Sequence, residues 1–166
     1  MRKISVFLAF GLVLFSLTAR ASDYKDWVPL LPDSLGGMGR SGDPEGVNMD
    51  MSGQKWSSLQ QQYRAGDGEK SVELIIVRGK GAPQLANFQM MSAMKMETED
   101  QIVKTLDVFG YKGLFNLAKK EKSGTLMISL SEEMLVVLDA EPITKEEEIL
   151  KLAEQLPLAK FAAQAK

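Results

Sequence analysis

Two stretches of this 166-residue chain alternate apolar and polar side chains, and this alternation constrains the fold more than any other feature. Val72, Leu74 and Ile76 share one face of an extended segment, and the Asp67-Gly68 pair before them favours a tight reversal. Residues 100–138 continue the pattern between polar turns. Period-two alternation bounded by turn residues predicts about six strands, joined by hairpins into a mostly antiparallel sheet.

The six predicted strands are residues 55–64, 71–78, 102–108, 111–117, 126–130 and 134–138. Met134–Leu138 is continuously apolar, which favours a strand buried on both faces. Such a strand needs apolar cover on each side, so helices are expected to pack on the sheet.

Two main helices supply the predicted cover. Pro83 suits the first turn of a helix, so the first is expected from Pro83 to about Met96. Leu85 and Phe88 are its expected core contacts.

The second helix begins with a capping box, in which the Thr144 hydroxyl accepts from the Glu147 N–H and the Glu147 carboxylate reaches back. Pro157 ends this helix and can begin a short one, from Leu158 to about Gln164. The element order is therefore ββαββββα, an α+β class. Across roughly residues 55–156 it resembles the PsbP-like group of small α/β sandwiches, a likeness of fold that implies no function.

The first 21 residues have the three parts of a secretory signal peptide. A basic start, Met1–Lys3, precedes an apolar run, Ile4–Leu17, and a small-x-small pattern ends at Ala21, where cleavage is expected. A permanent membrane anchor would need about 20 apolar residues, which is longer than this run. We therefore expect an exported protein, secreted or periplasmic, without a permanent anchor.

Residues 22–54 are predicted to be an extended Gly/Pro-rich N-terminal segment, because glycine and proline at this density interrupt regular structure. Only a short strand near Val47–Met51 is expected within it. Residues 55–166 are then predicted to form a single α+β domain.

The chain contains no cysteine and no histidine. This excludes Ser-His-Asp and Cys-His catalysis as well as thiolate or imidazole metal centres. Loss of Arg2, Lys3 and Arg20 with the signal peptide leaves 17 basic residues against 22 acidic ones, a net charge of −5. Because nucleic-acid binding requires a basic face, we expect no nucleic-acid partner, and nothing in the sequence indicates a cofactor.

Methionine is the compositional oddity, and Met90, Met91 and Met94 are the candidate binding residues. On a helical wheel they lie opposite the side that holds Leu85 and Phe88. The leading hypothesis is a non-enzymatic module that binds a protein partner or an apolar ligand through this helix and the Gly-rich segment. Core packing is the plain alternative, because methionine fills irregular gaps. Binding of Cu(I) or Ag(I) by three thioether sulfurs is the second functional hypothesis.

Two further hypotheses rest on oxygen ligands and acids. A weak candidate for a calcium site lies in a segment that is otherwise typical of a loop, and its residues are Asp43, Glu45, Asn48 and Asp50. A hydrolase built on carboxylates is the third functional hypothesis. It would need a cleft that holds two carboxylates, at least one of them desolvated.

Overall fold

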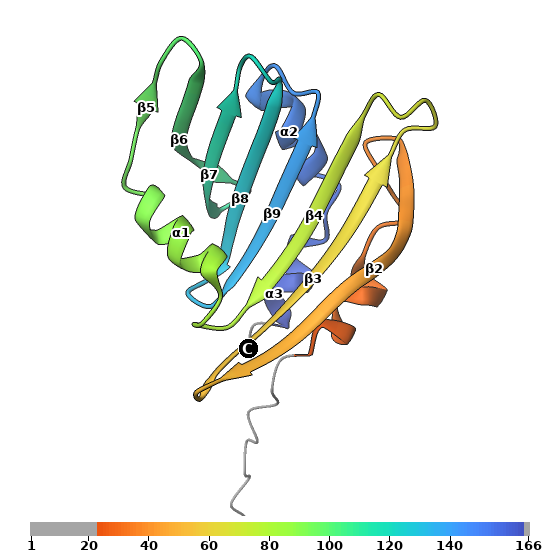
Figure 1. Cartoon of the computed structure of the whole chain (residues 1–166), viewed down its shortest axis with the longest axis vertical. Coiled ribbons are helices and arrows are strands. Elements are labelled where there is room, and N and C mark those ends of the chain that lie inside the picture. Colours follow the sequence, from red (N-terminus) through yellow and green to blue (C-terminus); the bar gives the residue numbers. More distant parts are fainter. Residues whose placement is uncertain (1–22, 165–166) are drawn as a thin grey trace, which may run out of the picture.

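A single nine-stranded antiparallel sheet forms the frame of the protein in the computed structural model, which describes residues 23–164 (Figure 1). The predicted signal peptide, residues 1–21, lies outside the described residues. The strand order is β1-β2-β3-β4-β9-β8-β7-β6-β5. The strands are β1 (Ser34–Leu35), β2 (Met38–Met51), β3 (Gln54–Arg64), β4 (Ser71–Arg78), β5 (Met96–Glu97), β6 (Gln101–Val108), β7 (Tyr111–Ala118), β8 (Ser123–Ser131) and β9 (Met134–Glu141).

Three α-helices and two short 3-10 helices accompany the sheet. They are α1 (Pro83–Met91), α2 (Glu146–Ala153), α3 (Leu158–Ala163), η1 (Tyr24–Asp26) and η2 (Val28–Leu30). The α+β class and the mostly antiparallel sheet are confirmed, but the sheet has nine strands rather than six. The three additional strands are β1, β2 and β5, and β2 includes the short strand that was expected near Val47–Met51. No helix of residues 23–164 is both long and apolar enough to cross a membrane.

The Gly/Pro-rich stretch that was predicted to be mostly loop instead forms β2, which pairs with β3 along its length. Its glycine and proline residues lie at a tight turn and at a β-bulge, two places where these residues are compatible with a strand. Gly36 and Gly37 both have positive φ and join β1 to β2 in a two-residue hairpin. Between Ser41 and Glu45 the register shifts, so that Gly42, Asp43 and Pro44 lie opposite a single β3 residue. Such a bulge accommodates a proline, which cannot donate to the ladder.

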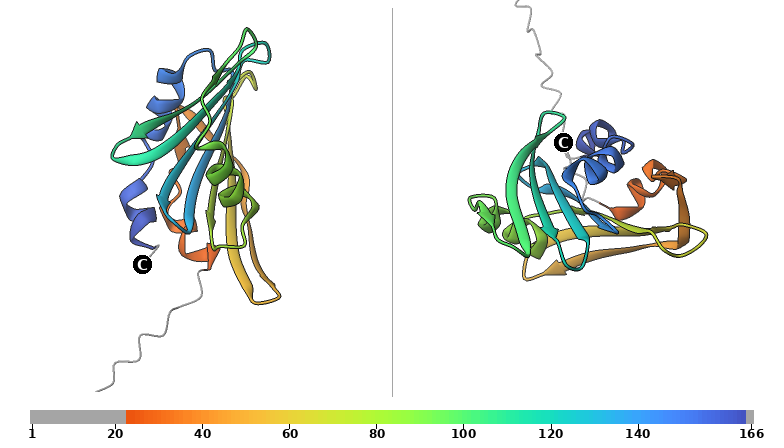
Figure 2. Two further views of the ribbon diagram at one scale, coloured as in Figure 1. Left: turned by 90° about the vertical axis from the view of Figure 1, so that its left-hand side faces the viewer. Right: turned by 90° about the horizontal axis from the view of Figure 1, so that it is seen from above.

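The sheet is strongly curved, and Figure 2 shows both of its edges turning toward the side that carries α2 and α3. This concave side holds the main core, in which α2, α3 and the N-terminal segment pack on the sheet. Its largest fully buried side chains include Trp27, Tyr63, Phe115 and Phe161. A smaller core lies on the other side, where Leu85 and Phe88 of α1 meet residues of β4, β6, β7 and β9.

Helix α1 ends at Met91, whereas the sequence predicted a helix to about Met96. Met96 instead belongs to β5 and pairs with Val103 of β6. The pairing places Met96 against the smaller core, a contact that the helical pattern does not reveal. The predicted core contacts of α1, Leu85 and Phe88, are both buried.

The capping interaction of α2 also differs from the prediction by one residue. Glu148, not Glu147, accepts from the Thr144 backbone N–H (2.8 Å) and from the Thr144 hydroxyl (3.2 Å). The helix begins one residue later than the capping box implies, with Lys145 at its N-cap. Glu148 is therefore the third residue of the helix, the position from which a side chain can reach back to the N-terminus. The short helix after Pro157 is confirmed as α3.

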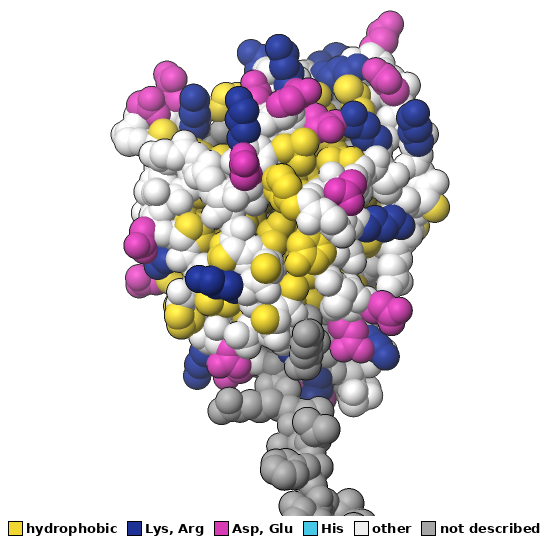
Figure 3. Space-filling model, turned by 180° about the vertical axis from the view of Figure 1, so that it is seen from behind, with side chains coloured by type: hydrophobic (Ala, Val, Ile, Leu, Met, Phe, Trp, Pro, Cys, Tyr) yellow, Lys and Arg dark blue, Asp and Glu magenta, His cyan; other side chains and the backbone are white. Residues whose placement is uncertain are grey.

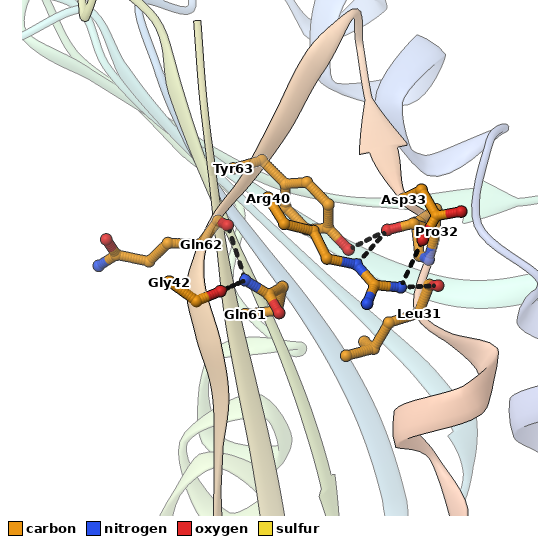
Figure 4. A network of polar contacts seen from close by, with 8 residues as sticks. All are labelled: Leu31, Pro32, Asp33, Arg40, Gly42, Gln61, Gln62 and Tyr63. Atoms are coloured by element: carbon orange, nitrogen blue, oxygen red, sulfur yellow. Dashed lines mark hydrogen bonds and ion pairs between the residues drawn. The ribbon is translucent and has the colours of Figure 1, made fainter.

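Arg40 of β2 binds the N-terminal segment, residues 31–33, to the sheet (Figure 4). Its guanidinium donates to the carbonyl oxygens of Leu31 and Pro32 and lies 3.2 Å from an Asp33 carboxylate oxygen. The Tyr63 hydroxyl donates to the same Pro32 oxygen at 2.9 Å. Burial raises the pKa of Tyr63, so its hydroxyl stays protonated and keeps this bond. The segment that contains Trp27 is thereby held over the main core.

Candidate functional site

Helix α1 covers only part of the convex face (Figure 1). A groove of about 530 Å³ lies between this helix and the sheet. This α1 groove is lined by Lys80, Leu85, Ala86, Phe88, Gln89, Ser92, Lys112, Ser129, Ser131 and Glu132. Leu85 and Phe88 contribute to its apolar wall, while serines and lysines make up much of its polar side. The volume lies within the range of pockets that hold small organic ligands, roughly 300–1,000 Å³.

Lys112 is the most distinctive polar group of the groove. Its Nζ lies 5.9 Å from the centre of the Phe88 ring and donates to Ser92 Oγ at 3.1 Å. Lys80, the other lysine, is paired with the Glu133 carboxylate at 3.3 Å. Within residues 23–164, Lys112 forms no ion pair with a carboxylate. The groove therefore holds one ammonium group that makes no ion pair among these residues, and the nearest acid in the register is Asp107, which lies opposite Lys112 on β6.

The three candidate methionines lie near the groove without lining it. Met90 is 69% exposed and Met94 46% exposed, whereas Met91 is half-buried against the smaller core. Met94 follows the end of α1 and does not continue the helix. The three sulfurs thus lie in different surroundings, and their binding of Cu(I) or Ag(I) remains a prediction that a Cu(I) titration under reducing conditions would test.

Above α1 in Figure 1, no helix covers the same face of the sheet. The register places five polar side chains in one row across five neighbouring strands: Gln62, Glu73, Asp139, Thr125 and Asn116. Side-chain hydrogen bonds form at two places in this row. Gln62 Nε2 and Gln60 Nε2 both donate to Glu73 Oε1, and Thr125 Oγ1 donates to Asp139 Oδ1 at 2.5 Å.

A small cleft of about 200 Å³ opens at this row, and Glu73, Asp139 and Glu141 are its acidic lining residues. Burial raises the pKa of Asp139, and the charges of Glu73 and Glu141 raise it further. The hydrogen bond from Thr125 opposes that rise, because it favours the ionised form. The cleft thus holds a carboxyl group that keeps its proton to a higher pH than an ordinary aspartate.

This acidic cleft was not predicted from the sequence. The one local signal is Asp139 itself, an acid directly after the apolar run Met134–Leu138. Its neighbours come from other strands, so only the register shows that Glu73 lies directly opposite Asp139.

The calcium candidates Asp43, Glu45, Asn48 and Asp50 all lie on β2 but are not gathered around one point. The Asn48 amide is used by the N-terminal segment, where it donates to Asp23 and accepts from the Tyr24 N–H. Asp50 forms an ion pair with Lys55 at 3.5 Å. Among residues 23–164, no cluster of three or more acids has an arrangement that could hold a metal ion.

The opposite face of the protein carries apolar side chains across its middle, with charged groups around them (Figure 3). On the concave side, a groove of about 320 Å³ lies where α2 meets the starts of β2 and β4 and the end of β9. Met38, Val72, Ile143 and Leu152 are among its lining residues. All four side chains belong to the main core. The apolar lining of this groove therefore consists of side chains that already pack in that core.

Comparisons with models of known protein families, with curated proteins and with solved structures give no match. The likeness in element order to the PsbP-like group therefore stays an expectation.

Proposed function

We propose that the protein is an exported, non-catalytic binding module that holds an apolar ligand in the α1 groove. The groove itself carries the proposal. It combines a volume of about 530 Å³ with an apolar wall, to which the exposed Ala86 and the largely buried Leu85 and Phe88 contribute, and a polar side rich in hydroxyl and ammonium groups. Pockets that bind small molecules share this composition, in which apolar surface supplies affinity and a few polar groups fix orientation.

The surroundings of α1 support the same proposal. Met90 and Met94 leave apolar surface exposed beside the groove. Methionine is common on surfaces that adapt to apolar ligands, because its side chain is unbranched and polarisable. The absence of histidine and cysteine from the chain supports binding over the common forms of nucleophilic catalysis.

Binding of a neutral apolar fluorophore, N-phenyl-1-naphthylamine, would test this function. We expect saturable enhancement of its fluorescence by the purified protein. Ala86→Trp should weaken binding at least tenfold, because Ala86 lines the groove and is exposed, so that the larger ring fills the groove without entering the core.

Asn87→Trp is the matched control, because Asn87 is the next residue of α1, is also exposed and does not line the groove. It should bind the fluorophore as the unmodified protein does. Equal loss in both variants, or no saturable binding to the unmodified protein, would contradict the proposed site.

A carboxylate-dependent hydrolase is the second candidate, and the acidic cleft is the observation that favours it. Glu73 and Asp139 are directly opposite each other on neighbouring strands, which places their Cβ atoms about 4.5–5.5 Å apart. One carboxyl with a raised pKa beside a second carboxyl is the arrangement that supplies a general acid and a base or nucleophile. In this scheme Asp139 would donate the proton and Glu73 would act as the second carboxylate.

Incubation with a panel of polysaccharides, followed by measurement of released reducing ends, would test this candidate. Any activity of this site should disappear in Asp139→Asn, while Asp26→Asn, an exposed residue of η1, should keep it. Release that persists in Asp139→Asn would exclude catalysis by the cleft.

A further inference from the structure

We infer that the ligand of the α1 groove is a single-chain carboxylic acid, with its carboxylate beside Lys112 and its apolar chain against Phe88 and Leu85. This inference rests on the proposed function and further specifies that the ligand is negatively charged.

The unpaired ammonium group of Lys112 carries the inference. Of the two lysines that line the groove, Lys80 is neutralised by Glu133. Lys112 has only uncharged partners within 23–164: the Ser92 hydroxyl and the face of the Phe88 ring. A carboxylate placed there would form a charge-assisted hydrogen bond, which is stronger than one between neutral groups.

The position of Lys112 distinguishes between the head groups that a ligand could carry. A carboxylate beside Phe88 would meet an ammonium group that makes no ion pair within residues 23–164. A ligand with a cationic head would instead meet an ammonium group beside the ring, where like charges repel.

Ser131 supplies a further donor for a carboxylate, whereas the Ser92 and Ser129 hydroxyls already donate to backbone carbonyl oxygens. The Ser131 oxygen accepts from the Glu133 N–H, and this leaves its own hydroxyl proton for another acceptor. The apolar wall begins at the same place, because Phe88 forms both the surface under Lys112 and part of the smaller core. A head group at Lys112 therefore directs an attached chain along Phe88 toward Leu85.

Isothermal titration of the purified protein with three ten-carbon probes tests the inference: decanoate, 1-decanol and decyltrimethylammonium, each below the concentration at which it aggregates. We expect decanoate to bind about tenfold more tightly than decanol, as one charge-assisted hydrogen bond would give. The cationic probe should bind more weakly than decanol.

Lys112→Met should remove the preference for decanoate and keep the binding of decanol, because the substitution retains an apolar stem and removes the ammonium group with its hydrogen bond to Ser92. Lys160→Met, on α3 at the opposite face, is the matched control and should leave the preference intact.

Equal affinities for decanoate and decanol, unchanged in Lys112→Met, would overturn the inferred charge while leaving the proposed function in place. Absence of binding by all three probes would overturn both. Tighter binding of an N-acetylated hexapeptide with a free C-terminal leucine than of decanoate would show that the groove takes peptide ends, and would overturn the choice of a single-chain acid.

Discussion

Gly46 of β2 lies directly against the ring of Tyr24, so closely that a Cβ atom on Gly46 would stand 2.0 Å from a carbon of that ring. Gly46→Ala should therefore push η1 away from the sheet and lower the free energy of unfolding by about 2 kcal/mol, as overpacking of a filled site does. Urea denaturation followed by fluorescence would measure the loss.

Gly39→Ala is the control for this prediction. Gly39 lies on the same strand, and an added Cβ there would meet no atom within 4 Å. Its free energy of unfolding should change little. Equal losses in the two variants would show that glycine itself, rather than the contact with Tyr24, determines the stability of β2.

Arg40 and Tyr63 share the Pro32 carbonyl oxygen, so their contributions should be coupled. Arg40→Met removes charge-assisted bonds to two carbonyl oxygens and should cost about 2 kcal/mol, whereas Tyr63→Phe removes one neutral bond and should cost about 1 kcal/mol. A double-mutant cycle would give the coupling energy. Hydrogen exchange should accelerate in residues 23–35 before it does in β4 or β9, and uniform acceleration would contradict a local role.

Glu148 should stabilise the start of α2, whereas Glu147 should not. The Thr144 backbone N–H lowers the pKa of Glu148, so its contribution is present above the ordinary glutamate pKa and is lost as the pH falls through the lower folded value. Glu148→Ala should cost about 1 kcal/mol near neutral pH. Glu147→Ala is the matched control and should cost less than about 0.5 kcal/mol. Thermal denaturation of both variants in strong acid should show the difference disappear.

Asp139 should have the opposite pH dependence. Its folded pKa is raised, chiefly by burial, so the folded state holds the proton more tightly than the unfolded state does. The protein should lose stability as the pH rises from the ordinary aspartate pKa through the raised folded value, and Asp139→Asn should remove this loss. Near neutral pH the variant should be at least as stable as the unmodified protein.

Thr125→Val provides a direct check on the same group. The Thr125 hydroxyl favours the ionised form of Asp139, so its removal should move the NMR titration midpoint of the Asp139 carboxyl carbon upward. A midpoint that stays in place would show that the hydroxyl does not act on the Asp139 carboxylate in solution.

The sequence and the structure agree best where a pattern is local. Val72, Leu74 and Ile76 alternate within one strand, and all three lie in the main core as their spacing indicates. The apolar stripe of α2 likewise places Ile149, Leu152 and Ala153 in the core. A period of two or 3.6 residues fixes which side chains share a face before any partner is known.

Disagreement arises where a distant partner decides the conformation. Residues 38–51 carry glycines and a proline that interrupt most strands, yet β3 supplies hydrogen-bond partners along β2, and Tyr24 requires a glycine at position 46. Met96 likewise leaves the helical pattern because Val103 pairs with it.

The amino-acid sequence by itself determined six of the antiparallel strands, the α2 helix and the exclusion of thiol and imidazole chemistry, because these follow from residue types and short-range periods. Only the tertiary structure decided that Phe88 and Lys112 meet at one groove and that Glu73 faces Asp139 across two strands. Such contacts depend on strand register and on the packing of α1, which are set by the burial of side chains far apart in the chain.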